Sequence, residues 1–319
     1  VQYQSYDVTD LLRQGDNAIG VILGDGWYCG HVAWADRQRS GDRPRLLAEL
    51  RVDYEDGEST LIATDESWRC SAGPILAGDL LMGEEYDARL EMPGWATADF
   101  DDSGWRDVMV FDDPGIDINA SLSPPVRPVR ELTPIDVRHI GRSRRGATYI
   151  FDLGQNMVGV IRLKVKGPAG RTIQLRYAEM LDDHGQLYTA NLRGARATDY
   201  YTLKGDGEEV YQPRFSFHGF RYVEVTGIED EPDADTVTGI VLQSDTPDTG
   251  SFECSDDLVN QLQSNIQWGQ RGNFLEVPTD CPQRDERLGW TGDAQVFVRT
   301  ACFNMDVAGF FAKWARSEE

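Results

Sequence analysis

One stretch of sixteen residues, 278–293, holds more groups that could do chemistry than any other part of the chain. It contains four carboxylates, two arginines and one tryptophan between helix-breaking residues: Asp280, Asp285, Glu286, Asp293, Arg284, Arg287, Trp290, Pro278, Pro282, Gly289 and Gly292. Proline lacks an amide donor and glycine favours the coil, so the sequence predicts a loop here rather than one continuous helix.

Carboxylates this close together raise one another's pKa, which is how glycosidases keep one acid protonated near neutral pH. Trp290 offers an apolar face to a pyranose ring. The stretch therefore predicts an active-site loop for a sugar. A solvated acidic loop is the alternative, because acidic runs usually have that role. The tryptophan and the paired arginines count against it, since a loop that only solvates needs neither.

Composition disfavours two kinds of partner. The 319 residues include 54 acidic and 31 basic side chains, giving a formal net charge of -23. This charge disfavours nucleic acid and anionic membrane surfaces, so a neutral substrate is expected. Only four of the basic residues are lysines, and a surface poor in lysine and rich in aspartate suggests adaptation to salt.

The cysteines indicate a reducing compartment. Their number is odd and their positions are scattered: Cys29, Cys70, Cys254, Cys281 and Cys302. This pattern fits neither a disulfide framework nor a zinc site, so we expect reduced thiols and a cytoplasmic location. No apolar run of eighteen residues and no signal peptide is visible. The chain begins at Val1 without an initiator methionine, so we expect the first strands of its first domain to be missing.

The elements around the loop change character along the chain. Residues 1–130 contain short apolar runs between turn residues, which predicts an N-terminal β-sandwich of jelly-roll type with strands at 18–23, 46–54 and 59–64. The proline-rich segment 124–128 is the first expected boundary. Residues 131–243 predict a second antiparallel β-sandwich, with strands at 148–151, 158–165, 172–177, 199–203 and 222–226.

Residues 244–319 change from strand to helix patterns. Ser255 is the expected N-cap of a first helix, because two aspartates follow it at the positive end of the helix dipole. Further helices are expected at 294–302 and 307–315. Two or three helices cannot bury their apolar faces alone, so other elements must cover them or this domain is truncated.

In these motifs the chain resembles the bacterial α-L-rhamnosidases of glycoside hydrolase family 78. The strongest likeness is the segment 280–293, DCPQRDERLGWTGD, which matches the active-site signature of that family. Shorter likenesses follow in the family's order: YDVTD at 6–10, LGDGWY at 23–28, GEEYDAR at 83–89, FDLGQN at 151–156, NLR at 191–193 with Asp199, and FHGFRY at 217–222.

The resemblance implies two β-sandwiches followed by the start of an (α/α)6 barrel, and release of terminal α-L-rhamnose with inversion of configuration. By the matching positions, Glu286 is the general acid. Asp280, Arg284, Trp290 and Asp293 hold the rhamnose beside the scissile bond. Rhamnose-containing glycosides or polysaccharides are the implied partners.

Inversion also requires a carboxylate base about 6.5 to 9.5 Å from the acid. The resemblance places this base on a glutamate beyond Glu319, so residues 1–319 alone are expected to be inactive. The alternative is that the chain is a non-catalytic carbohydrate-binding fragment. No cofactor is expected in catalysis. The resemblance allows calcium in the N-terminal sandwich, without an assigned ligand set.

Each of these residues has a structural alternative. Glu286 would be a surface residue paired with the arginines around it. Trp290 would belong to the barrel core, Asp293 would cap the following helix, and Arg284 would pair with adjacent acids.

Overall fold

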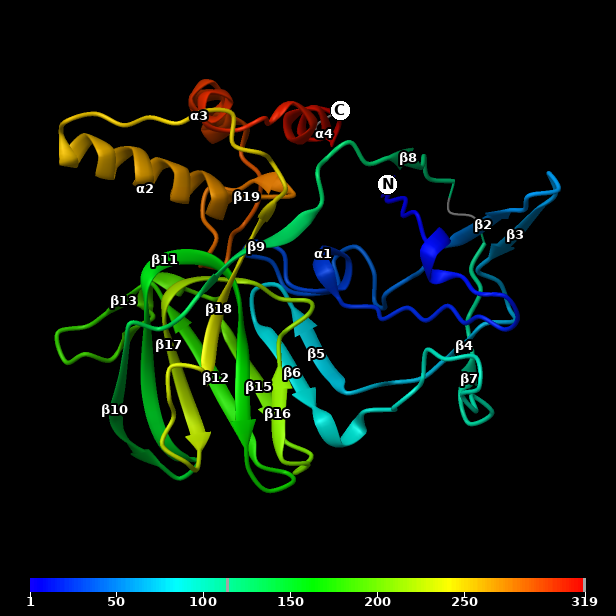
Figure 1. Cartoon of the computed structure of the whole chain (residues 1–319), viewed down its shortest axis with the longest axis horizontal. Coiled ribbons are helices and arrows are strands. Elements are labelled where there is room, and N and C mark those ends of the chain that lie inside the picture. Colours follow the sequence, from blue (N-terminus) through cyan, green and yellow to red (C-terminus); the bar gives the residue numbers. More distant parts are fainter. Residues whose placement is uncertain (113–114, 318–319) are drawn as a thin grey trace.

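The computed structural model describes residues 1–112 and 115–317 of the chain. Strands dominate as far as Ser244 and helices follow (Figure 1). This confirms the predicted fold class, a mainly β protein with the first helices of a helical domain at its end. The described helices include none that is long and apolar enough to cross a membrane.

Most strands of the N-terminal region are short and pair two by two. The pairs are β1 (Gln2–Tyr3) with β8 (Asn119–Ala120), β2 (Glu49–Asp53) with β3 (Ser59–Ala63), and β4 (Arg69–Cys70) with β7 (Arg106–Asp107). Two short helical turns, η1 (Thr9–Leu11) and α1 (Gly26–Cys29), complete this region. The strand predicted at 18–23 was wrong: its apolar run is exposed and pairs with no described strand.

A curled sheet of ten strands forms the main body of the molecule (Figure 1). Its strands in chain order are β5 (Ile75–Asp79), β6 (Gly83–Asp87), β9 (Val126–Leu132), β10 (Asp136–Ser143), β11 (Gly146–Lys166), β12 (Thr172–Ala178), β15 (Thr198–Thr202), β16 (Glu208–Tyr211), β17 (His218–Ile228) and β18 (Val237–Ser244). The spatial order is β5-β6-β15-β12-β17-β11-β18-β9, and β10 and β16 also pair with β11. The core inside this sheet includes Phe151, Ile161, Leu175, Phe220 and Val225, all fully buried.

Two strands of the N-terminal region belong to this sheet. β6 pairs in parallel with β15, so Glu85 lies opposite Tyr200. The turn between β5 and β6 is thereby fixed on the large sheet, where Glu84 is completely buried. This pairing joins residues on both sides of the boundary predicted at residue 130, whose position stays a prediction.

The segments predicted as two strands at 148–151 and 158–165 form one long strand, β11. Its register with β17 shifts between Asp152 and Met157, and Gly154 has a φ of 73° within that shift. Such an irregularity bends a strand, so one strand can pair with several neighbours along its length. Outside this sheet, β13 (Met180–Leu181) pairs with β14 (Leu187–Tyr188), and the short helical turns η2 (Ala88–Leu90) and η3 (Ala190–Leu192) lie in connections.

Three helices lie together at one end of the sheet (Figure 1). They are α2 (Asp257–Asn273), α3 (Thr291–Asn304) and α4 (Ala308–Ser317). The side chain of Asp256, and not Ser255 as predicted, accepts the first amides of α2, because it stands one residue nearer to the first turn. Leu258, Val296 and Phe303 remain exposed on these helices, as expected for a helical domain whose faces are not fully covered.

Candidate active site

The acidic loop is closed at its base by β-structure. β19 (Phe274–Leu275) and β20 (Val277–Pro278) form a tight hairpin before the loop, and α3 begins directly after it. Thr279 bridges to Gly289, and the Trp290 amide donates to the Pro278 carbonyl at 3.2 Å. A side chain at Gly289 would collide with the Trp314 ring, which lies 2.4 Å from the position of its Cβ. The sequence 280–288 therefore projects as one compact loop.

Glu286 lies inside this loop and is 7% exposed. Its Oε2 atom accepts hydrogen bonds from Arg284 Nε and from Arg193 Nη2, both at 3.0 Å. The thiol of Cys281 lies 3.9 Å from the same oxygen. The carboxyl is therefore buried and paired, which excludes the alternative of an exposed surface residue but retains the ion pairs that this alternative expected.

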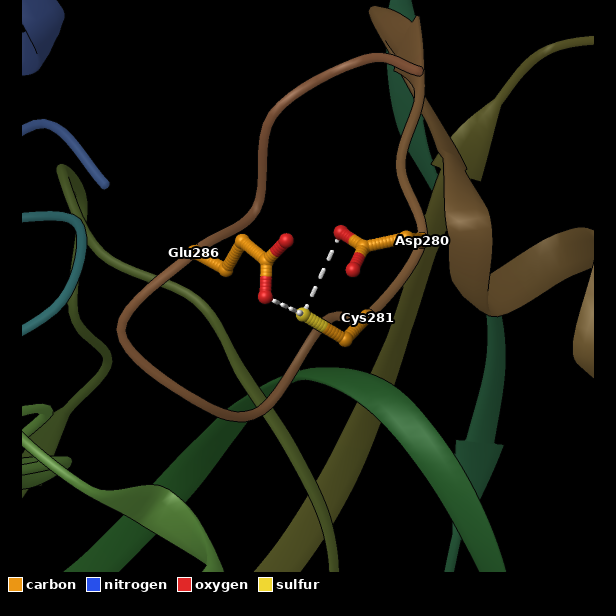
Figure 2. Close-up of side chains that lie close together, drawn as sticks. All are labelled: Asp280, Cys281 and Glu286. Atoms are coloured by element: carbon orange, nitrogen blue, oxygen red, sulfur yellow. Dashed lines mark hydrogen bonds between the residues drawn. The ribbon is translucent and has the colours of Figure 1, made fainter. Parts of the chain in front are cut away.

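Asp280 lies beside Glu286. Arg284 Nη2 donates to Asp280 Oδ2 at 2.9 Å, and the Cys281 thiol lies 3.3 Å from Asp280 Oδ1. One ligand atom each from Asp280, Cys281 and Glu286 lie within 4.8 Å of one another (Figure 2). Arg284 thus bridges two carboxyls that the sequence placed six residues apart.

The two carboxyls differ in proton affinity. Burial raises the pKa of Asp280, and the hydrogen bond with Glu286 raises it further. Burial also raises the pKa of Glu286, but hydrogen bonds from Asp280, Arg284 and Arg193 outweigh burial, so its pKa lies below the usual value. In this arrangement the carboxyl that keeps its proton to higher pH is Asp280.

Trp290 and Asp293 follow the loop at the start of α3. Trp290 is 38% exposed, which disfavours the alternative of a core residue. Its ring centroid lies 6.4 Å from the ring of Trp34, an exposed residue of the N-terminal region. Asp293 is exposed in the first turn of α3, and in the described part of the chain its side chain forms no hydrogen bond or ion pair with the other four residues. The N-cap of α3 is Trp290, so Asp293 does not hold the capping position.

Two further arginines hold the loop, and neither was predicted to have a role. Arg193 lies in the connection between β14 and β15 and reaches both Asp285 and Glu286. Arg287 is 2% exposed and donates to the carbonyls of Leu80 and Phe217, both at 2.5 Å. The NLR likeness at 191–193 was the signal that could have identified Arg193. For Arg287, the sequence does not indicate which backbone carbonyls its side chain binds.

The cluster of Asp280, Cys281 and Glu286 has the donor atoms of a metal site, but its charges and protonation do not suit a metal ion. The guanidinium groups of Arg193 and Arg284 already occupy the carboxylates. Burial raises the pKa of the Cys281 thiol to about 12, whereas a metal ligand must be the thiolate. These residues do not fit a metal ion. The cluster also lies outside residues 1–130, so calcium in that region stays a prediction without assigned residues.

Three family models match the chain in succession. They are the alpha-L-rhamnosidase N-terminal domain at residues 1–130, the bacterial alpha-L-rhamnosidase concanavalin-like domain at 142–243, and the bacterial alpha-L-rhamnosidase 6 hairpin glycosidase domain at 247–318. Among curated relatives, an alpha-L-rhamnosidase of Streptomyces avermitilis is 52% identical over 315 residues, or 98% of this chain and 30% of the relative. One of Formosa agariphila is 45% identical over 321 residues, or 98% of this chain and 34% of the relative.

Solved structures agree with these matches. The Streptomyces avermitilis alpha-L-rhamnosidase complexed with L-rhamnose superposes with a TM-score of 0.86 at 51% identity, covering 91% of this chain and 28% of that structure. The Aspergillus terreus α-L-rhamnosidase gives 0.90 at 42% identity, covering 99% of this chain and 37% of that structure. The chain spans about a third of the length of the curated relatives that it matches. Taken together, these likenesses show that the chain belongs to the bacterial α-L-rhamnosidases of glycoside hydrolase family 78.

Proposed function

We propose that the protein containing this chain hydrolyses terminal, non-reducing α-L-rhamnose residues from rhamnosides, with inversion of configuration. The relatives that support this are named alpha-L-rhamnosidases, and one similar structure holds L-rhamnose. No organic cofactor or catalytic metal takes part in this proposal. The strongly negative surface suits a neutral sugar better than an anionic ligand.

The observation that carries the proposal is the pair of adjacent carboxyls, half-buried Asp280 and buried Glu286, in a compact loop that ends at the partly exposed Trp290. Glycosidases that use two carboxyl groups need one of them to protonate the departing glycosidic oxygen. We assign this step to Glu286. Asp280, Arg284 and Trp290 contact the sugar, with Asp293 at the edge of the same subsite.

The proton that Glu286 donates comes from the coupled pair of carboxyls, Asp280 and Glu286. Two interacting carboxyls titrate together, so a proton held by the pair belongs to both. Burial and the Glu286 hydrogen bond keep the pKa of Asp280 raised, which retains one proton in the loop above the pH at which an isolated carboxyl loses it. The proposal is that this proton reaches the leaving oxygen through Glu286. A sugar hydroxyl that binds Arg284 weakens one of the ion pairs that now keep Glu286 ionised.

Inversion requires a second carboxylate that activates water on the opposite face of the sugar. The proposal places this base on a glutamate of the barrel outside residues 1–319. An assay of residues 1–319 with an aryl α-L-rhamnoside tests that placement, because appreciable turnover by this segment would mean that the base lies within it. Rhamnose binding without turnover would support the other candidate, a carbohydrate-binding segment.

Glu286→Gln in the full-length protein tests the acid. The amide keeps the size of the side chain but has no acidic proton, so we expect turnover to fall by about 10²–10⁴-fold, whereas the dissociation constant for L-rhamnose, measured calorimetrically, changes little. Glu131→Gln is the matched control, because Glu131 is exposed on β9 and its ion pair in the described part of the chain is with Arg162, away from the acidic loop. Turnover of Glu286→Gln close to that of the control would reject the assignment.

A further inference from the structure

Arg193 belongs to the sheet region but its side chain ends in the acidic loop. It follows the short turn η3 between β14 and β15, 93 residues before Glu286. Arg193 Nε lies 2.7 Å from Asp285 Oδ1, and Arg193 Nη2 donates to Glu286 Oε2 at 3.0 Å. One guanidinium therefore holds two successive carboxylates of the loop.

The backbone that carries Arg193 is strained. Its φ is 53° and its ψ is -114°, a conformation that residues other than glycine rarely adopt. Strain of this kind costs on the order of 1–3 kcal/mol and persists only where surrounding contacts determine it. An observed outlier of this kind is a pointer to function.

The surrounding contacts are present. Leu192, Ala195 and Ala197 pack with Leu81 in a small buried cluster. The amide of Ala197 donates to the Leu81 carbonyl at 3.2 Å. The connection 190–197 is thus fixed to the turn between β5 and β6, so the guanidinium starts from a rigid base.

Gly194 extends the contact with the acidic loop. Its amide donates to Asp285 Oδ2 at 2.9 Å. A Cβ atom at this position would lie 2.7 Å from the same oxygen, so a larger residue would displace the Asp285 carboxylate. Asp285 is consequently held from the side chain of Arg193 and from the backbone of the next residue.

Four groups face the Glu286 carboxyl in the described part of the chain. Arg284, Asp280 and Cys281 come from the loop itself, and Arg193 comes from the sheet region. Asp285 precedes Glu286 and is occupied by Arg193. Arg284 is shared with Asp280, so its position depends on the sugar subsite. Arg193 does not contact Asp280 and has a rigid support, which makes it the fixed member of the pair of cations.

We propose that Arg193 is a positioning residue for the predicted acid: it orients the Glu286 carboxyl from the neighbouring domain and sets the pH range in which that carboxyl delivers its proton. This inference rests on the proposed function. A lysine cannot fully replace Arg193, because a single ammonium lacks the planar guanidinium that spans two carboxylates.

The sign of the pH effect follows from the charge. A cation beside a carboxylate lowers its pKa, so removal of Arg193 raises the pKa of Glu286. The acid then stays protonated to higher pH. The alkaline limb of the kcat profile therefore moves upward, although kcat at the optimum falls because the carboxyl is less well oriented.

The test uses three variants of the full-length protein with an aryl α-L-rhamnoside. For Arg193→Met we expect kcat to fall roughly 10- to 100-fold, as for a misplaced catalytic group, with KM nearly unchanged. We expect its alkaline limb to move to higher pH, since a positive charge next to the carboxylate is lost. Arg193→Lys should leave the alkaline limb close to its wild-type position, because the charge remains, but its kcat should still fall. Arg196→Met is the matched control: Arg196 lies in the same connection and pairs with Glu85 instead of the acidic loop.

The outcomes separate the two proposals. A wild-type protein without rhamnosidase activity overturns the proposed function. An active wild type in which Arg193→Met keeps both its rate and its alkaline limb overturns only the role of Arg193. Gly194→Ala separates a change of structure from a change of charge, because it displaces the Asp285 carboxylate but keeps the Arg193 guanidinium. Its kcat should fall while the alkaline limb of its pH profile stays in place. If this limb moved as in Arg193→Met, the charge would not be its cause, and the inference would be wrong.

Discussion

At the residue scale, the acidic loop is balanced charge by charge. Arg193 pairs with Asp285 and Glu286, and Arg284 pairs with Asp280 and Glu286. Buried carboxylates need such partners, because desolvation of an unpaired charge is costly. The third cation, Arg287, has a different environment: its guanidinium meets backbone carbonyls and the face of the Phe217 ring at 4.9 Å.

Arg287 is the structural anchor of the loop. Its hydrogen bonds join Leu80 of the β5–β6 turn, Phe217 before β17, and the loop carbonyls of Gln283 and Arg284. Burial lowers the pKa of Arg287 to about 10, so the group is still charged at neutral pH. Three segments far apart in the sequence therefore meet at one cation.

We predict that Arg287→Met lowers the free energy of unfolding by about 3 kcal/mol or more, because the variant removes the hydrogen bonds of a buried guanidinium to four backbone carbonyls. Urea unfolding followed by tryptophan fluorescence measures the change. Arg51→Met is the control, since Arg51 and Asp53 form an exposed pair worth less than about 1 kcal/mol. Equal midpoints for the two variants would contradict the anchoring role.

The sequence predicted part of this site for a simple reason. Asp280, Arg284 and Glu286 lie within seven residues, so their proximity follows from any compact loop. Arg193 and the Leu80 carbonyl are brought to the loop by the sheet, across 93 and 207 residues, and periodicity carries no information on such pairings. The protonation order was not predictable either, because it depends on which carboxyl the two arginines face.

At the element scale, β11 organises the sheet. It pairs with β10, β16, β17 and β18. Its apolar segments were predicted correctly from their composition, but the register shift near Gly154 that joins them was not. Alternation indicates strands and their buried faces. It does not reveal that β5 and β6 join the sheet of a later segment through a parallel pair with β15.

Gly159 lies where β11 changes neighbours. Its φ is 157°, and a Cβ atom would lie 1.9 Å from the Ile240 carbonyl oxygen of β18. We predict that Gly159→Ala lowers the free energy of unfolding by about 3 kcal/mol or more, the sum of backbone strain and overpacking. Thermal unfolding monitored by circular dichroism measures this.

Gly141 provides the matched control for Gly159. It has a φ of 145° in β10, but no atom lies within 4 Å of its Cβ position. Gly141→Ala should therefore cost only the strain, about 1 kcal/mol. If the two alanine variants were equally destabilised, the contact with Ile240 would not be what requires glycine at position 159.

At the scale of the whole molecule, charge opposes folding. The net charge of -23 on 319 residues produces repulsion that many exposed ion pairs, such as Arg138 with Asp136, offset only in part. The site region is partly insulated from this repulsion, because Asp280 and Glu286 are largely shielded from solvent and paired with their own arginines. Salt should therefore stabilise the molecule through its surface without changing the pairing in the loop.

We predict that the unfolding temperature rises by several degrees between about 10 mM and 0.5 M sodium chloride and then levels off, because the screening length falls from about 30 Å to a few Å over this range. Calorimetry at increasing salt, with sodium sulfate as a comparison, separates the causes. If screening is the cause, the unfolding temperatures in both salts fall on one curve when plotted against ionic strength. If exclusion of the salt from the protein surface is the cause, sulfate continues to stabilise at high concentration. A protein with full stability in dilute buffer would show that self-repulsion is not a significant term, and the adaptation to salt suggested by its four lysines would be wrong.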